Sequence, residues 1–331
     1  MEQPKRILVR SPNWLGDHIM ALAFYNQIRR LFPESYLVCW YPVGLKGILP
    51  EKLFDEEWEF NKSDLKAHQK IKEWIEKIKG FNFDLSINLT ASWSSALLFY
   101  RAKIPQRLGF SESGSQILLT RSQHFRGVKA GIHKSQIYLN LISLFGKERI
   151  PFEVPLNQTL RKTVPESFWV IAPGAALPLR EWPFFPELIF EIKKRYPEKI
   201  LKIVGTSVES AWKARIARWK LQGVEDWIEK TSLSELKDLC SRAELVLAND
   251  SGVAHLAATL GRSRTLVLFG PGNPNYIAPQ GPAVLSIRAE PPVACSPCEK
   301  SYCRAPEGYQ RCLREISVES VLSAIKSSLF L

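Results

Sequence analysis

The stretch ELVLANDSGVAHLAATLG (residues 244–261) indicates the fold most clearly. Its apolar run LVLA predicts a buried strand, and the small apolar pattern VAHLAATL predicts the helix that follows. Asn249, Asp250 and Ser251 lie between them, and all three residue types are favourable at a helix N-cap. Gly252 then lets another group approach the backbone closely. A strand that passes into a helix in this way is the unit from which parallel α/β sheets are built.

The same alternation of strand and helix patterns runs along both halves of the chain. Amphipathic patterns predict helices, of which 19–32 is the first and 317–330 the last. Short apolar runs between the helices predict strands at 7–9, 36–40, 56–60, 84–89, 107–110, 168–174, 200–206, 244–250, 265–270 and 283–289. Strands that alternate with helices predict parallel sheets with helices on their faces.

One stretch, IPFEVPLNQTLRKTVPES (150–167), interrupts this alternation with three prolines and no clean period, as is typical of an interdomain linker. We therefore predict an α/β protein of two Rossmann-like, doubly wound domains, 1–155 and 156–331, that face a central cleft. The last helix is left open to pack back on the first domain. Ligands of such sheets bind outside the carboxyl ends of the strands.

Composition and charge narrow the function classes. A chain of 331 residues with 45% apolar and 24% charged residues is typical of a soluble protein of two domains. No apolar run approaches the roughly 20 residues of a membrane span, and we find no secretion signal, so we expect a cytoplasmic protein. The net charge of +12 favours an anionic partner, and 101–134 holds seven Lys or Arg against one acidic residue, Glu112. A solvated basic face is the plainer interpretation of that stretch.

Two predicted strand-to-helix turns in the second half suit an anionic ligand. The start of the helix at Ser251 and Gly252 offers free N–H groups to a phosphate, whereas the carboxylate of Asp250 suits sugar hydroxyls. His255 follows Ser251 by four residues, so both side chains can face one ligand. In APGAALPLREWP (172–183), Gly174 keeps the turn small and Arg180 offers a guanidinium fork to phosphate oxygens. The alternatives are a plain helix cap with a core histidine, and an arginine that faces water.

A third turn, SPNWLGD, follows the first predicted strand and places Asp17 at the rim of the first domain. Such a carboxylate can act as a general base for a substrate hydroxyl, or serve only as an N-cap. The chain contains neither G-x-G-x-x-G nor G-x-x-x-x-G-K-[ST], which removes most support for a dehydrogenase or a P-loop ATPase.

Four cysteines, Cys295, Cys298, Cys303 and Cys312, form the pattern C-x2-C-x4-C-x8-C near the end of the chain. This spacing suits one tetrahedral structural zinc, or four reduced thiols that pack a small subdomain. The spacing alone favours the zinc, but we do not expect a functional metal there.

Together these motifs resemble glycosyltransferase family 9, the heptosyltransferases of lipopolysaccharide core synthesis. PNWLGD, PGA…REWP, and NDSG-x-x-H-x-A-A with LFGP behind it have the order and spacing found in that family. The tail CSPCEKSYCRAPEGYQRCLREISVESVL resembles the branch that adds the second heptose. The resemblance covers nearly the whole chain.

The resemblance implies a GT-B fold, with the acceptor on the first domain and the nucleotide-sugar on the second. It implies inverting, metal-independent transfer of heptose from ADP-heptose to the lipopolysaccharide inner core, with Asp17 as the catalytic base. The residues it implies for donor binding are Gly174, Arg180, Thr231, Asp250, Ser251, Gly252 and His255. Of these, Thr231 would line the adenine pocket. An acidic residue that some members use on the ribose has no evident counterpart, since GTSVES places Ser207 there.

The expected partners are ADP-heptose, an acidic, phosphorylated lipid A–core acceptor and the inner face of the inner membrane, where the protein would be peripheral. No cofactor is expected for catalysis, and no nucleic acid. One alternative is a transferase of the same family with another donor or acceptor. A remote alternative is a basic nucleic-acid-binding protein with a zinc-like cysteine cluster. It predicts binding that weakens steeply with salt, but gives no reason for Asp17 or for ANDSG.

Overall fold

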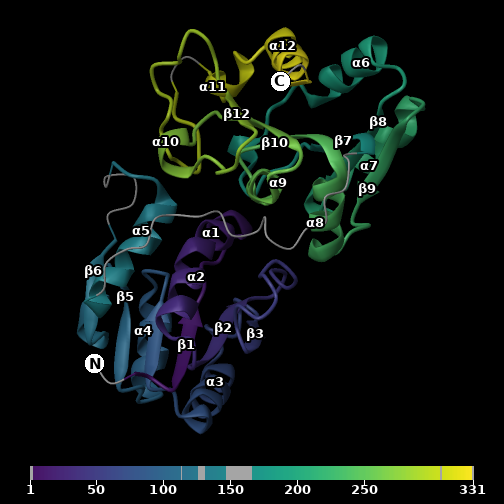
Figure 1. The fold of residues 1–331 in the computed structure, drawn as a ribbon. Coiled ribbons are helices and arrows are strands. Elements are labelled where there is room, and N and C mark those ends of the chain that lie inside the picture. Colours follow the sequence, from purple (N-terminus) through teal and green to yellow (C-terminus); the bar gives the residue numbers. More distant parts are fainter. Residues whose placement is uncertain (1–2, 113, 126–130, 147–165, 306–307, 330–331) are drawn as a thin grey trace. The chain divides into compact units, whose positions relative to one another are not determined.

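A computed structural model of the chain describes residues 3–112, 114–125, 131–146, 166–305 and 308–329. The chain divides into two compact units, Met1–Pro155 and Leu156–Leu331 (Figure 1). Most of the predicted linker, 150–165, lies outside the described residues.

The first unit is built on one parallel sheet of six strands in the order β3-β2-β1-β4-β5-β6. This is the 3-2-1-4-5-6 order of a doubly wound Rossmann fold, in which ligands bind where the strand order reverses, here between β1 and β4. The strands are β1 (Arg6–Arg10), β2 (Tyr36–Pro42), β3 (Glu56–Phe60), β4 (Leu85–Asn88), β5 (Gln106–Ser111) and β6 (Arg121–His124).

Helices cover this sheet because each buries an apolar face on it. Leu8, Trp40 and Ile78 belong to one buried cluster, which joins the sheet to the helices after β3 and β4. The predicted helix 19–32 forms two helices that meet at Ala21. The helices are α1 (Leu15–Met20), α2 (Leu22–Leu31), α3 (His68–Phe81), α4 (Trp93–Arg101) and α5 (Lys134–Asn140), with short 3-10 turns η1 (Ser115–Leu118) and η3 (Leu141–Phe145).

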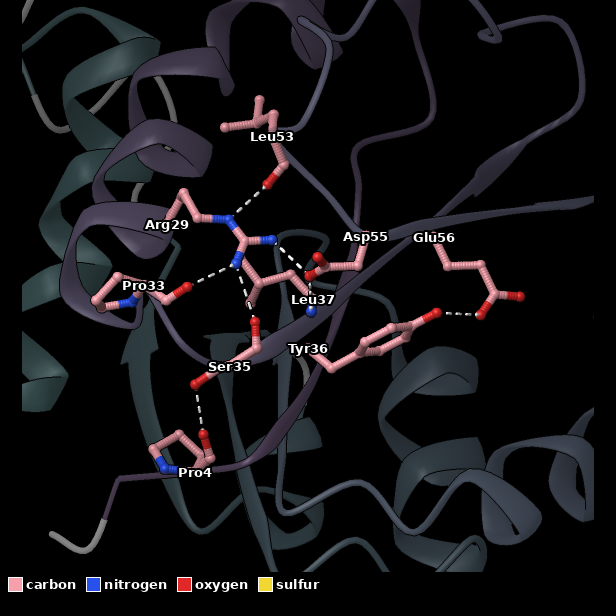
Figure 2. Close-up of polar contacts among 9 residues, drawn as sticks. All are labelled: Pro4, Arg29, Pro33, Ser35, Tyr36, Leu37, Leu53, Asp55 and Glu56. Carbon is pink, nitrogen blue, oxygen red and sulfur yellow. Dashed lines mark hydrogen bonds and ion pairs between the residues drawn. The ribbon is translucent and has the colours of Figure 1, made fainter.

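The amino edge of this sheet is held by Arg29, near the end of α2 (Figure 2). Its guanidinium pairs with Asp55 at 2.6 Å and donates to the carbonyls of Ser35 at 2.9 Å and Leu53 at 3.1 Å. Burial alone would raise the pKa of Asp55, but hydrogen bonds from the Leu37 amide and from Arg29 outweigh it and lower that pKa. These contacts fasten α2 to the starts of β2 and β3, so this edge is structural.

The second unit repeats the plan, with the strand order β12-β11-β10-β7-β8-β9. When the strands are numbered from β7 in chain order and read from the β9 edge, this is again 3-2-1-4-5-6, and the order reverses between β7 and β10. The strands are β7 (Glu166–Ala172), β8 (Ile200–Gly205), β9 (Val224–Ile228), β10 (Ala243–Asn249), β11 (Arg264–Leu268) and β12 (Val284–Ile287). The prediction of two Rossmann-like, doubly wound α/β units is confirmed.

The helices of the second unit are α6 (Phe185–Arg195), α7 (Ala211–Trp219), α8 (Leu233–Arg242), α9 (Gly252–Leu260), α10 (Pro274–Ile277), α11 (Arg311–Arg314) and α12 (Val318–Leu329), with 3-10 turns η5 (Pro178–Arg180) and η6 (Ser207–Glu209). The last helix, α12, packs on α6 and β11 (Figure 1). Its Val321, Leu322 and Ile325 are buried in the core of this unit. The apolar face of this helix is therefore used within the second unit.

Within the described ranges, no helix is both long and apolar enough to cross a membrane.

Candidate active site

In the second unit, the side chain of Asn249 joins the turns that follow β7 and β10. Asn249 ends β10 and is fully buried. Its Nδ2 donates to the carbonyl of Pro173 at 2.7 Å, and its Oδ1 accepts from the N–H of Trp182 at 3.0 Å. Both partners lie in the loop after β7, so one amide fixes that loop at the point where the strand order reverses. This is where a doubly wound sheet binds its ligand.

Arg180 and Asp250, predicted separately as donor residues, form an ion pair at this point. Arg180 Nη1 lies 2.7 Å from Asp250 Oδ2, and the carboxylate is only 4% exposed. A buried carboxylate needs such a partner, because an unpaired charge in the interior is costly. A second carboxylate, Glu299, lies with Oε2 3.8 Å from Arg180 Nη2. The structure thus brings these two predicted residues together and adds a third that the sequence did not suggest.

Two buried polar atoms beside this ion pair have no partner in the described part of the chain. They are Nε of Arg180 and Oγ of Ser251. Ser251 is the N-cap residue of α9, yet its hydroxyl makes no capping hydrogen bond. A buried donor or hydroxyl without a partner is costly, and these two lie where a doubly wound sheet binds its ligand, so a ligand there can pair them. Gly252 begins α9, and His255 is buried one turn further along it.

Carboxylates gather around Gly174, in the turn after β7. A Cβ atom at Gly174 would overlap the carboxyl group of Glu209, so a larger residue there would force Glu209 to move. The carboxylate of Glu181 accepts a hydrogen bond from the Ala175 amide. Burial raises the pKa of Glu181, the Ala175 hydrogen bond opposes this, and the charge of Glu209 raises it further. This part of the edge therefore offers hydrogen-bond acceptors, as hydroxyl groups require.

An acidic residue, Glu209, lies two residues after Ser207, and its carboxyl group is close to Gly174. Its Oε2 accepts from the N–H of Thr206 at 2.6 Å in a capping box that starts η6. The pattern Thr-x-x-Glu of such a box was the signal that could have found it.

Thr231 lies apart from this cluster. It is partly buried and follows β9, which is separated from β7 by β8. No described contact joins it to Arg180 or Asp250, so its place in an adenine pocket stays a prediction.

In the first unit, Asp17 lies in the first turn of α1, beyond the carboxyl end of β1. Lys134, the first residue of α5, donates from Nζ to Asp17 Oδ1 at 2.8 Å. The two side chains are 17% and 20% exposed, for lysine and aspartate respectively, so the pair is accessible on one side. The sequence did not suggest Lys134 as a partner of Asp17.

Arg10 fixes the loop that carries Asp17. It ends β1 and is buried against the ring of Phe60, with Cζ 4.4 Å from the ring centroid. Its guanidinium donates to Oδ1 of Asn13 at 2.5 Å and to the carbonyl of Ser11. Burial lowers the pKa of Arg10 to about 9, so it remains a cation at neutral pH. This arginine therefore holds SPNWLGD against the end of β1.

His18 follows Asp17 but points into the core. Its ring is fully buried, and Nδ1 lies 3.2 Å from the hydroxyl of Tyr25. Burial, with a smaller effect of the nearby Arg10 charge, lowers the pKa of His18 to about 3. His18 is thus neutral at physiological pH, and the carboxylate of Asp17 remains the accessible base of this turn.

The described basic residues of 101–134 lie at two different edges of the sheet. Its first part, 101–107, links the end of α4 to the start of β5 and so lies at the amino edge of the sheet. Arg107 and Arg121 donate to backbone carbonyls at 2.8 and 2.9 Å. Lys134 lies at the other edge, beside Asp17. Arg126 and Lys129 are outside the described residues. Arg101, Lys103 and Arg121 are exposed, as a solvated face requires, whereas Arg107 and Lys134 are partly buried.

The four clustered cysteines range from exposed to buried. Cys295 is exposed, Cys298 and Cys303 are intermediate, and Cys312 is buried. Burial raises the pKa of Cys312 to about 11, and the three neighbouring thiols add to the effect. Among the residues that the structure describes, no group of three or more His, Cys, Asp or Glu is arranged to hold a metal ion.

Comparisons with known proteins identify the fold and the family of the chain. Lipooligosaccharide heptosyltransferase 2 of Haemophilus ducreyi is 23% identical, over 98% of this chain and 99% of the relative. The structure of ADP-heptose LPS heptosyltransferase II from Escherichia coli superposes with a TM-score of 0.75 at 20% identity, over 98% of each chain.

A family 9 glycosyl transferase from Veillonella parvula superposes with a TM-score of 0.77 at 20% identity, over 100% of this chain and 99% of that one. These two superpositions show a shared fold. The sequence profile of glycosyltransferase family 9 (heptosyltransferase) matches residues 71–308, well over half of the chain. The chain therefore belongs to glycosyltransferase family 9, the heptosyltransferases, as its motifs predicted.

Proposed function

We propose that this glycosyltransferase moves heptose from ADP-heptose to the inner core of lipopolysaccharide, with inversion at the anomeric carbon, and that it adds the second heptose. The observation that carries the proposal is the pair of buried, unpartnered atoms, Arg180 Nε and Ser251 Oγ, beside the Arg180–Asp250 ion pair. A diphosphate offers acceptor oxygens to both atoms, and a sugar nucleotide also offers hydroxyls to the carboxylates nearby.

On the donor side, Asp250 orients the guanidinium of Arg180 through Nη1, so that Nε can donate to a phosphate oxygen. The N–H groups at the start of α9 lie at the positive end of the helix dipole and would stabilise the same anion. Positive groups of the protein beside the departing ADP lower the barrier to transfer. They do so because negative charge develops on the terminal phosphate of ADP as its bond to the sugar breaks. Glu209 and Glu181 around Gly174 are suited to the hydroxyls of the ribose.

On the acceptor side, Asp17 would take the proton of the acceptor hydroxyl as that oxygen attacks the anomeric carbon. Lys134 holds Asp17 Oδ1 at 2.8 Å, and the described residues provide no second partner for this carboxylate. One carboxylate oxygen is therefore fixed while the other can reach the substrate. In this scheme neither step uses a metal.

We also propose a class of acceptor and a location in the cell. A net charge of +12 favours an acidic, phosphorylated lipid acceptor and an anionic membrane surface. We place the protein at the inner face of the inner membrane, in peripheral contact with it. The heptosyltransferase names of its relatives support the same acceptor class.

The test is incubation of the purified protein with ADP-heptose and with core acceptors that carry no heptose or one heptose, followed by mass spectrometry. We expect one added heptose on the acceptor that already carries one, with release of ADP. Transfer only to the acceptor without heptose would assign the first addition instead. No heptose on either acceptor, with a donor of known quality, would overturn the proposal.

A further inference from the structure

The cysteine-rich segment 295–312 has no role in the proposed reaction, yet it supplies a carboxylate to the donor site. Glu299 lies between Cys298 and Cys303, and its Oε2 is 3.8 Å from Nη2 of Arg180. Its side chain is 25% exposed, so it lies at the edge of the site and not in the core.

The segment holds Glu299 in a defined position. The residue has a left-handed backbone conformation, with φ of 54°. Its N–H donates to the carbonyl of Pro271 at 2.9 Å, and the N–H of Cys298 donates to the same oxygen at 3.0 Å. Its Oε1 accepts from the N–H of Asn273. The backbone and one carboxylate oxygen are thus fixed to the loop after β11, which leaves Oε2 directed toward Arg180.

The rest of the segment supports this loop. The Oγ of Ser296 donates to the carbonyl of Gly270 at 2.6 Å. Gly270 lies so close to Leu313 and Cys312 that a Cβ atom there would overlap the Leu313 side chain. The cysteine-rich segment therefore forms part of the wall beside Arg180.

A fixed carboxylate at this point opposes the binding of phosphate. Like charges a few ångströms apart near a protein surface repel, and the repulsion grows with the charge of the ligand. The terminal phosphate of ADP loses a second proton near neutral pH, whereas in ADP-heptose that oxygen is bonded to the sugar, so ADP carries about one more negative charge than ADP-heptose. Glu299 should therefore weaken the binding of ADP more than that of ADP-heptose.

We propose that Glu299 is a specificity-determining residue, which the cysteine-rich segment holds beside Arg180 so that the enzyme discriminates its donor, ADP-heptose, from its more highly charged product, ADP. The inference rests on the proposed function, since it takes Arg180 as a ligand of the diphosphate. It gives the segment a role that requires no metal.

The test is calorimetric titration of the wild type and Glu299→Gln with ADP and, without acceptor, with ADP-heptose. Glutamine keeps the size of the side chain and the acceptor for the Asn273 amide, but removes the charge. We expect ADP to bind about tenfold more tightly to the variant and ADP-heptose about threefold more tightly, so that the ratio of the two affinities changes. The ADP inhibition constant measured during transfer should fall with the ADP dissociation constant.

The matched control is Glu244→Gln, at the opposite edge of the same sheet. Glu244 is 26% exposed and pairs with Lys199 at 2.7 Å, so this variant removes the same charge from a similar ion pair. It should leave both affinities unchanged. An ADP affinity that Glu299→Gln leaves unchanged or weakens would overturn the inference alone. A wild-type protein that binds neither nucleotide would overturn the proposed function and this inference together.

Discussion

At the scale of single residues, the neutral, buried state of His18 makes the first unit sensitive to acid. In the folded protein the pKa of His18 is about 3, whereas its ordinary value is 6.5. Between these values the unfolded chain binds the proton and the folded chain does not. The free energy of unfolding therefore falls as the pH drops below about 6.5, by up to about 1.4 kcal/mol per pH unit for this one group.

We therefore expect the first unit to lose about 2–3 kcal/mol between pH 7 and pH 4.5 through His18 alone. The measurement is urea denaturation at both pH values, followed by hydrogen exchange of the β1 amides, for the wild type and His18→Gln. Glutamine does not titrate, so the variant should lose less stability than the wild type by that amount. Equal losses in both proteins would show that other groups cause the effect.

Lys134 acts through a contact between segments that lie far apart in the sequence. Its ammonium group fixes one oxygen of Asp17 at 2.8 Å. We expect Lys134→Met to lower kcat about 10- to 100-fold, because the base loses its orientation, and to leave the KM for ADP-heptose within about twofold. Steady-state kinetics with both substrates would measure this.

Two further variants make the Lys134 prediction specific. Lys134→Arg keeps a cation beside Asp17 and should restore most of kcat. Lys199→Met breaks a pair of similar exposure, with Glu244, and should leave kcat unchanged. A KM effect without a kcat effect in Lys134→Met would mean that Lys134 serves substrate binding and not the base.

At the scale of elements, η5 depends on a residue from the far end of the chain for its position. Gln310 is 5% exposed, and its Nε2 donates to the carbonyl of Pro178 at 2.7 Å and to that of Glu181 at 3.5 Å. These carbonyls flank Arg180. Gln310→Met removes the donor that holds both carbonyls, and the loss of such a hydrogen bond costs about 0.5–1.5 kcal/mol. We expect the dissociation constant of ADP to rise about three- to tenfold.

Calorimetric titration with ADP would measure this effect, together with a thermal unfolding curve. The control is Gln27→Met, which replaces a glutamine of equal exposure in α2 of the first unit. That variant should lower stability without changing ADP affinity. A Gln310→Met protein that loses stability but binds ADP as the wild type does would show that Gln310 supports only the fold.

The elements themselves were predictable where the apolar pattern was strong. The buried strands β1, β7, β10 and β11 and the helix α9 follow from their sequences. Two edge strands could not be predicted from their sequences. They are β6, with sequence RSQH, and β9, with sequence VEDWI. Edge strands face water along one side and need fewer apolar residues, so their sequences resemble loops.

The residues of the candidate site also differ in whether the sequence predicts them. Asp17, Arg180 and Asp250 could be placed at carboxyl ends of strands, because each follows a recognisable strand along the chain. Lys134 and Glu299 could not, since their contacts join segments that are more than a hundred residues apart. The cysteines around Glu299 also form a pattern that indicates a metal site, and that pattern does not identify the acid between them as a site residue.

At the scale of the whole molecule, the proposed reaction divides between the two units. The first unit carries Asp17 and Lys134 at the carboxyl edge of its sheet, and the second carries Arg180, Asp250 and Ser251 at the matching edge. The two sheets have the same strand order, so each presents its residues where that order reverses. Donor binding and proton removal should therefore be separable by mutation.

We expect Asp17→Asn to abolish transfer while it leaves the dissociation constant of ADP-heptose within about twofold of the wild type, because asparagine fills the same space but cannot accept the proton. Arg180→Ala should weaken ADP binding about 10- to 100-fold, since it removes a charged hydrogen-bond donor and the ion pair with the buried carboxylate of Asp250. Calorimetry and a transfer assay on both variants would measure the two effects. Turnover in Asp17→Asn would exclude Asp17 as the base, and an unchanged ADP affinity in Arg180→Ala would move the diphosphate site away from the Arg180–Asp250 pair.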